Sequence, residues 1–169
     1  MNIRPENTKD HDAIQKVTYN AFENHPHHEV GSKPTEHLIV NKLRKSGALS
    51  VSLVAHEGSN IIGHIAFSPV TIAEEQCNWF GLGPVSVITE RQGEGIGGQL
   101  INAGLEKLKE LGAQGVVLLG EPEYYGRFGF KAEAGLILPD IPPEFFLALS
   151  LNEVTLLPSG IVSYHHSFT

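Results

Sequence analysis

The chain has 169 residues, of which 41% are hydrophobic and 18% are charged. This balance excludes a disordered chain, and the length fits one domain spanning residues 1–169. The net charge of −7 provides no general attraction to nucleic acid or to an anionic membrane, so neither is an expected partner. The single cysteine, Cys77, excludes an internal disulfide and fits a reducing compartment. Without a signal-like or membrane-spanning apolar run, we expect a soluble, cytoplasmic protein.

Two amphipathic helices are predicted in the first third of the chain, after a short strand at residues 2–4. Apolar residues recur at helical spacing from Asp10 to Phe22. Residues 23–32 are rich in His and have no period. Pro34 then opens a second helix, and Gly47 is expected to end it as the C-cap.

The middle of the chain predicts antiparallel strands. Apolar and polar residues alternate through residues 50–72, and the turn signal at residues 57–60 divides this segment into the two strands of a hairpin. Another strand is expected at residues 79–88. These elements are typical of a sheet with one buried face.

A parallel crossover is predicted after the hairpin. The strongest helical pattern covers residues 95–111, and the continuous apolar run at residues 116–119 reads as a buried strand, so residues 85–119 form a strand, a helix and a parallel strand. Three weaker elements follow: a one-turn helix at 122–125 and strands at 129–133 and 145–151. This order of elements predicts an α+β (mixed α/β) fold with a central, mostly antiparallel sheet and flanking helices.

A glycine-rich loop precedes the long helix. Residues 90–98 read Glu-Arg-Gln-Gly-Glu-Gly-Ile-Gly-Gly, with four glycines within six residues. Free backbone N–H groups at a helix start bind phosphate oxygens, and glycine lets the ligand approach the backbone. A bare connecting turn is the simpler alternative, but it does not need four glycines where each lowers helix stability. The loop therefore predicts a site for a phosphorylated ligand.

The same loop raises the alternative of a dinucleotide enzyme. Gly93, Gly95 and Gly98 satisfy G-x-G-x-x-G, and Glu121 lies 23 residues beyond Gly98. That fold requires the first glycine directly after a strand and two successive halves of parallel strands. Here four residues separate Ile88 from the first glycine, and only one crossover is predicted.

The loop also reads Gln-x-x-Gly-x-Gly, and the sequence here resembles the GNAT superfamily of acyl-CoA-dependent N-acyltransferases. Further motifs stand in the family's order, most similar to the YhbS-like branch of predicted acetyltransferases. They are Gly63–Val70, the central strand Leu82–Val87, the strand Val117–Gly120 and the late Tyr-x-x-x-Gly-Phe segment at Tyr124–Phe130. Two positions depart from that branch. Glu94 stands where Lys or Arg is common, and Thr89 replaces a frequent Pro.

The resemblance implies a GNAT-like three-layer fold and transfer of an acetyl group from acetyl-CoA to an amine by direct attack in a ternary complex. Val87 N–H is the expected oxyanion donor, and Tyr125 the expected proton donor to the leaving thiolate, with Tyr124 as its substitute. The expected coenzyme-binding residues are Val85, Ser86, Val87, Gln92, Gly93, Glu94, Gly95, Ile96, Gly97 and Gly98. A non-catalytic acyl-CoA sensor or assembly module on the same fold is the alternative.

No general base is assigned. Glu74 and Glu75 read as a solvated turn, and His64 reads as a hydrogen-bonded core histidine. Cys77 without a placed His partner reads as buried rather than as a covalent nucleophile.

The His-rich segment is not expected to bind metal, because helical ligand spacing is missing and Pro26 favours an extended loop. Its His and Glu residues are His25, His27, His28, Glu29, Glu36 and His37. In the resembling family this segment shapes the acceptor pocket. The acceptor amine is not identified, although the acidic chain favours a cationic one, and a homodimer stays open.

Overall fold

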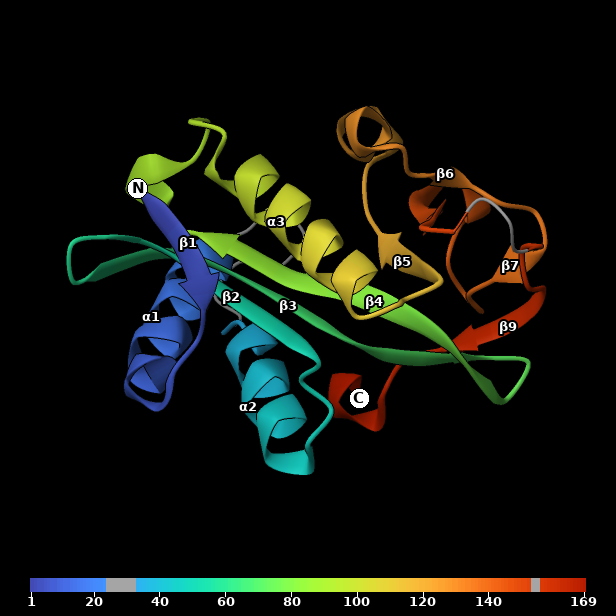
Figure 1. Ribbon diagram of the computed structural model, residues 1–169, viewed down its shortest axis with the longest axis horizontal. Helices are drawn as coiled ribbons and strands as arrows, with labels where there is room; N and C mark the ends of the chain where they lie inside the picture. Colours follow the sequence, from blue (N-terminus) through green and yellow to red (C-terminus); the bar gives the residue numbers. More distant parts are fainter. Residues whose placement is uncertain (24–32, 153–155) are drawn as a thin grey trace.

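The computed structural model describes residues 1–23, 33–152 and 156–169, which form a central sheet with helices on both faces (Figure 1). The strand order is β1-β2-β3-β4-β5-β8-β6, and β9 pairs with both β3 and β7. The strands are β1 Asn2–Pro5, β2 Val51–Glu57, β3 Asn60–Ile72, β4 Glu75–Val87, β5 Gly115–Leu119, β6 Lys131–Ala132, β7 Leu136–Ile137, β8 Phe146–Ser150 and β9 Gly160–Ser163. The α-helices are α1 His11–Phe22, α2 Glu36–Ser46, α3 Ile96–Glu110 and α4 Pro122–Tyr125.

The sheet is mixed and mostly antiparallel. Successive pairs from β1 to β4 are antiparallel, as is β5 with β8. β4 and β5 are parallel and are joined through α3, which confirms the predicted crossover. A short parallel pair of β7 with β9 was not predicted. Among the described residues, the sheet does not contain the two halves of parallel strands that a dinucleotide-binding fold would have.

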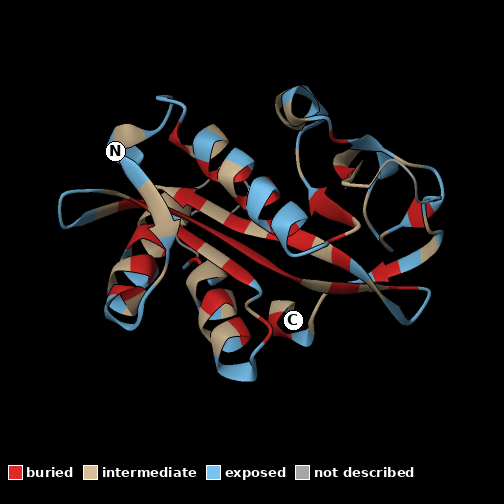
Figure 2. Ribbon diagram, viewed as in Figure 1, coloured by how far each residue is buried: buried red, intermediate tan, exposed pale blue. Residues whose placement is uncertain are grey.

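Helices cover the two faces separately. α3 lies over one face, and α1 and α2 lie over the other (Figure 1). α3 is amphipathic, and its buried side includes Leu100, Ile101 and Leu108, which belong to the same hydrophobic core cluster as Phe67 of β3. Burial is greatest along the middle strands and on the inner sides of these helices (Figure 2). The sequence pattern therefore produces three layers, with apolar contacts on both sides of the sheet.

The predicted element boundaries are close to the observed ones, with two informative differences. β4 begins at Glu75, before the expected residue 79, because Ala73 and Glu74 form a tight turn with φ of 52° and 66°. The predicted crossover unit begins at Val85, whereas the parallel contact with β5 lies earlier in the chain, at Trp79–Gly81. Gly47 ends α2 with φ of 78°, as the sequence predicts.

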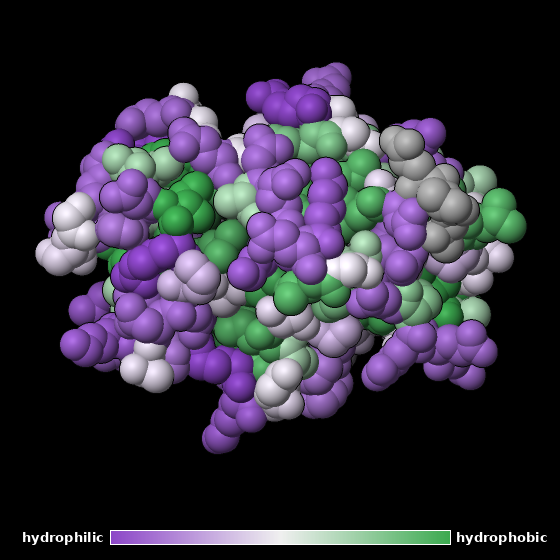
Figure 3. Space-filling model, in the orientation of Figure 1, coloured by the Kyte–Doolittle hydropathy of each residue, from purple (hydrophilic) through white to green (hydrophobic). Residues whose placement is uncertain are grey.

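Hydrophilic side chains cover much of the face seen in Figure 3, including the outer side of α3. Across the described parts of the chain, we find no helix with the length and apolar character needed to cross a membrane.

Candidate active site

The two parallel strands separate at the centre of the molecule. β4 contacts β5 only from Trp79 to Gly81, and a register shift follows as β4 passes through Gly83 and Pro84. From there to Val87, β3 is the strand that pairs with β4 within the described part of the chain, and β8 is the one that pairs with the end of β5. In the described sheet, the edge of β4 that turns toward β5 therefore carries backbone N–H and C=O groups without a strand partner.

The glycine-rich loop lies between the end of β4 and the start of α3. Gly93 and Gly95 have φ of 82° and 85°, a backbone conformation that strains other residues. The first hydrogen bond of α3 runs from Gln99 N–H to the Gly95 carbonyl, at 3.1 Å. The preceding amides of the first turn have no acceptor within the helix, and the helix dipole adds positive potential there. The loop thus has the geometry of an anion site.

A second contact fixes this loop to the central strand. The Gln92 side-chain amide donates to the Val87 carbonyl at 3.0 Å. Gln92, which stands in the Gln position of the family motif, therefore connects the loop to the end of β4.

A cavity of about 500 Å³ opens in front of the loop. Its far wall comes from α4 and the turn that follows it. A Cβ built on Gly97 would lie 3.7 Å from the Tyr124 hydroxyl, and one on Gly98 would lie 3.5 Å from the Phe128 ring. The lining residues are Val87, Arg91, Gln92, Gly93, Gly95, Ile96, Gly97, Gly98, Gln99, Asn102, Tyr124, Arg127 and Phe128. Glycine thus leaves the amides of the first helical turn open to a ligand.

Tyr124 and Tyr125 occupy different positions. Tyr124 lines the cavity, whereas Tyr125 does not. Tyr125 packs edge-on against Phe130, and its ring lies 2.4 Å from where a Cβ on Gly120 would stand, directly against the end of β5. Burial raises the pKa of the Tyr125 phenol, and the adjacent Tyr124 adds to the rise. A phenol with an ordinary pKa of about 10 is already protonated at neutral pH, and this rise makes Tyr125 harder still to ionise.

These features coincide with family and structural matches. The chain matches the family model described as "Acetyltransferase (GNAT) domain" over residues 2–132. It is 36% identical over 135 residues to the uncharacterized N-acetyltransferase YhbS of Escherichia coli K12, covering 77% of this chain and 81% of YhbS. The chain belongs to the GNAT acetyltransferase family.

Two solved GNAT structures extend the similarity to nearly the whole chain. An acetyltransferase from Brucella melitensis, in complex with acetyl-CoA, is 44% identical with a TM-score of 0.86, covering 99% of this chain and 97% of that one. YhbS from Escherichia coli, in complex with CoA, is 34% identical with a TM-score of 0.89, covering 99% of this chain and 91% of that one. The predicted fold and family are confirmed.

The structure brings most of the predicted GNAT site residues together. Val87 and six of the seven loop residues line the cavity, the exception being Glu94. Ser86 is buried at 2% exposure. Because side chains alternate along a strand, Ser86 faces the opposite side of the sheet from Val87 and Val85. The Ser86 side chain therefore does not line the cavity.

Glu94 does not stand as an isolated charge beside the loop. Its carboxylate accepts a hydrogen bond from Arg91 Nε at 2.9 Å. The two terminal nitrogens of the same guanidinium donate to Glu57 at the end of β2. The departure from the family pattern at Glu94 is thus compensated locally by an ion pair.

Three lining residues of the cavity were not predicted from the sequence: Asn102 of α3, and Arg127 and Phe128 of the far wall. Arg127 lies inside the Tyr-x-x-x-Gly-Phe segment, so a basic residue within this motif is the sequence feature that could have indicated an anion-binding side chain. Its proximity to the loop depends on tertiary packing, which no local pattern reveals.

The remaining candidates stay outside the site. Glu74 lies in the β3–β4 turn, and Cys77 is half-buried, with burial raising the pKa of its thiol. Among the described residues, no group of His, Cys, Asp or Glu is arranged to hold a metal. The predictions for His25, His27, His28 and Glu29, and for this segment's influence on the acceptor, fall outside the described residues.

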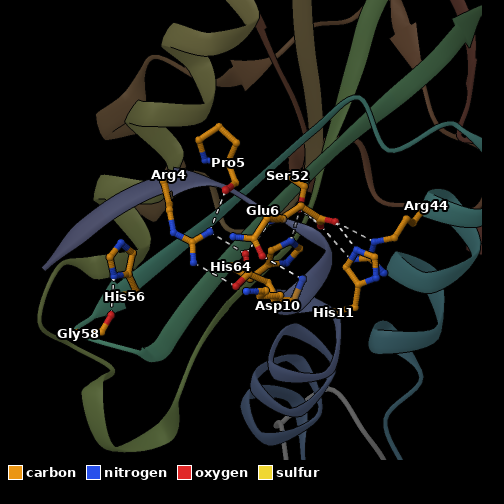
Figure 4. Close-up of polar contacts among 12 residues, drawn as sticks. Arg4, Pro5, Glu6, Asp10, His11, Arg44, Ser52, His56, Gly58 and His64 are labelled. Carbon is orange, nitrogen blue, oxygen red and sulfur yellow. Dashed lines mark hydrogen bonds and ion pairs between the residues drawn. The ribbon is translucent and has the colours of Figure 1, made fainter.

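His64 is a core histidine, as predicted. It is fully buried, and its Nε2 lies 2.7 Å from Ser52 Oγ (Figure 4). Ser52 in turn donates to Glu6, which also accepts two hydrogen bonds from Arg44. Burial lowers the pKa of His64 to about 4 despite the opposing attraction of Glu6.

This histidine makes the fold sensitive to acid. The unfolded chain protonates the ring below its ordinary pKa of 6.5, whereas the folded protein does so only near pH 4. The unfolding free energy should therefore fall by about 2 kcal/mol from pH 7 to pH 4.5 through this group alone. Urea titrations at both pH values should show a smaller fall for His64→Gln. Equal falls for the variant and the wild type would contradict this origin, since Glu6 and Asp10 titrate in both proteins.

Proposed function

We propose that this protein transfers an acetyl group from acetyl-CoA to an amine by direct attack within a ternary complex. The observation that carries the proposal is the cavity in which open amides of the Gln92–Gly98 loop adjoin the separated edge of β4. The coenzyme complexes of the two similar structures support it, because they are 44% and 34% identical and cover nearly the whole chain.

We give the residues the roles that the resemblance to the family implies. The loop amides bind the diphosphate, which is anionic and suits a helix start. The backbone of residues 85–87 hydrogen-bonds the pantetheine arm, as a missing strand would. Val87 N–H stabilises the oxyanion, and Tyr125 donates a proton to the thiolate as it leaves.

The acceptor is an amine, and its class is constrained only by charge. An alkyl amine has a pKa of about 10.4 and must lose a proton before it attacks. The chain's net charge of −7 favours a cationic acceptor. The proposal includes two further points. Residues 1–169 act as one domain, since α3 shares one hydrophobic core with strands from β2 to β5. The protein works in the cytoplasm, where acetyl-CoA is available.

Two measurements test the proposal. Calorimetric titration with CoA is expected to saturate at one coenzyme per chain, with NAD binding far more weakly. A panel of small amines, amino acids and peptides with free N-termini, assayed for thiol release from acetyl-CoA, should then identify the acceptor class. Failure of CoA to bind, or tighter binding of NAD, would overturn the assignment.

A further inference from the structure

The cavity has a charge that the whole chain does not share. Its lining includes two arginines, Arg91 and Arg127, and no carboxylate among the described residues. The chain as a whole carries a net charge of −7. Arginines in the lining of a cavity point to an anionic ligand, and these two differ in what they can offer it.

Arg91 is already committed to protein carboxylates. Its Nε donates to Glu94 at 2.9 Å, and both terminal nitrogens donate to Glu57, one of them at 3.2 Å. Every nitrogen of the guanidinium therefore has an anionic partner. A phosphate could bind Arg91 only by displacing one of these carboxylates.

Arg127 is held in place but has donors to spare. Its Nε donates to the Tyr124 carbonyl at 2.9 Å, and the guanidinium carbon lies 4.5 Å from the centre of the Tyr124 ring. These two contacts fix the plane of the group. Among the described residues, the two terminal nitrogens have no hydrogen-bond or ion-pair partner. Arg127 thus presents an oriented fork of N–H donors at the cavity wall.

Arg127 lines the same cavity as the anion-binding loop. Tyr124 and Phe128, on either side of it in sequence, lie next to Gly97 and Gly98 at the start of α3. An extended ligand whose diphosphate lies on these amides would therefore pass close to the guanidinium. Planar bidentate donors of this kind match phosphate oxygens well.

We propose that Arg127 binds a phosphate group of the coenzyme, whereas Arg91 binds none and serves to neutralise Glu94. This inference rests on the proposed function, since it assigns residues within the same site. The phosphate is either the diphosphate or the 3′-phosphate of CoA. Both present the same chemistry to a guanidinium, and dephospho-CoA distinguishes them.

The first experiment measures coenzyme affinity by calorimetry. Arg127→Gln is expected to raise the Kd for CoA about tenfold, because one charge-assisted hydrogen-bond pair is lost. Lys131→Gln, which makes the same change in charge on exposed β6, is the matched control and should leave the Kd within twofold. Arg127 is exposed, so the variant is expected to fold, and its melting temperature checks this. A wild-type Kd in Arg127→Gln would overturn the inference while leaving the proposed function intact.

The phosphate source is tested with two analogues. Acetyl-pantetheine has no phosphate ester, so Arg127→Gln and wild type should use it with equal kcat/KM. A tenfold loss with this substrate would contradict a phosphate role. The second analogue, dephospho-CoA, lacks the 3′-phosphate. If Arg127→Gln still binds it more weakly than wild type does, Arg127 contacts the diphosphate; if the two proteins bind it equally well, Arg127 contacts the 3′-phosphate.

The role of Arg91 requires paired substitutions. Arg91→Gln leaves the Glu94 carboxylate uncompensated beside the diphosphate, so the Kd should rise, and adding Glu94→Gln should restore it. The same second substitution should not restore Arg127→Gln to wild-type affinity. If the loss in Arg91→Gln persists after Glu94→Gln, Arg91 itself contacts the ligand and the division of roles is wrong.

Discussion

Replacing Tyr125 with Phe is expected to lower kcat by about 100-fold or more while leaving the Kd for CoA within twofold. The phenol is the predicted proton donor to the thiolate that leaves when the tetrahedral intermediate collapses. A phenol carries its proton at neutral pH, and burial holds the pKa of Tyr125 above the ordinary value. The ring contacts with Phe128 and Phe130 do not involve the hydroxyl, and Phe keeps them. Steady-state kinetics and calorimetry together measure the two effects.

Tyr124→Phe is the matched control for this variant. It removes the same atom from the neighbouring residue and retains the ring under Arg127. We expect its kcat to change by less than about threefold. If Tyr124→Phe loses turnover and Tyr125→Phe does not, the acid is the residue on the cavity wall. If neither variant changes turnover, the phenol has no catalytic role. A protein that binds CoA but releases no thiol with any amine would be the non-catalytic module instead.

The parts of the fold that the sequence predicted are those with a long, local pattern. α3 repeats its apolar stripe over several turns, and β2 and β3 alternate around a turn marked by Gly58. β7 and β9 were missed because they are short and are stabilised by pairing with remote strands rather than by a pattern of their own. The tight turn at Ala73 and Glu74, which no glycine or proline marks, explains the late predicted start of β4.

In the candidate site, too, the features that depend on local sequence could be predicted and those that depend on remote contacts could not. Gln92 to Gly98 are consecutive, so their free amides follow from local chemistry and could be predicted. The separation of β4 from β5 depends on a register shift near Gly83 and on the pairing of β4 with β3 and of β5 with β8. No sequence motif predicts either feature. Arg91 and Arg127 look alike in sequence. They differ in their partners: Glu57, from a distant hairpin, and Glu94 accept hydrogen bonds from every nitrogen of Arg91, whereas the Tyr124 carbonyl accepts one from Nε of Arg127.

Substitutions at Gly97 are expected to change coenzyme affinity and the free energy of unfolding in different ways. It lies in the first turn of α3, where its N–H has no acceptor within the helix, and its φ is not positive. A Cβ there would meet Tyr124 Oη at 3.7 Å and Val87 at 3.9 Å, which are ordinary contact distances. The fold therefore tolerates a side chain at this position, whereas the cavity loses the space in front of the amides.

Gly97→Ala should raise the free energy of unfolding by about 0.5–1 kcal/mol, because alanine favours the helix. The same substitution should raise the Kd for CoA about tenfold, and Gly97→Val about 100-fold, as the side chain covers amides that otherwise bind the diphosphate. Urea unfolding and calorimetry measure the two effects separately. Gly126→Ala is the matched control, since a Cβ there meets nothing within 4 Å and Gly126 does not line the cavity. Unchanged CoA affinity in Gly97→Val would mean that the coenzyme does not lie on this helix start, and the proposed site would have to be abandoned.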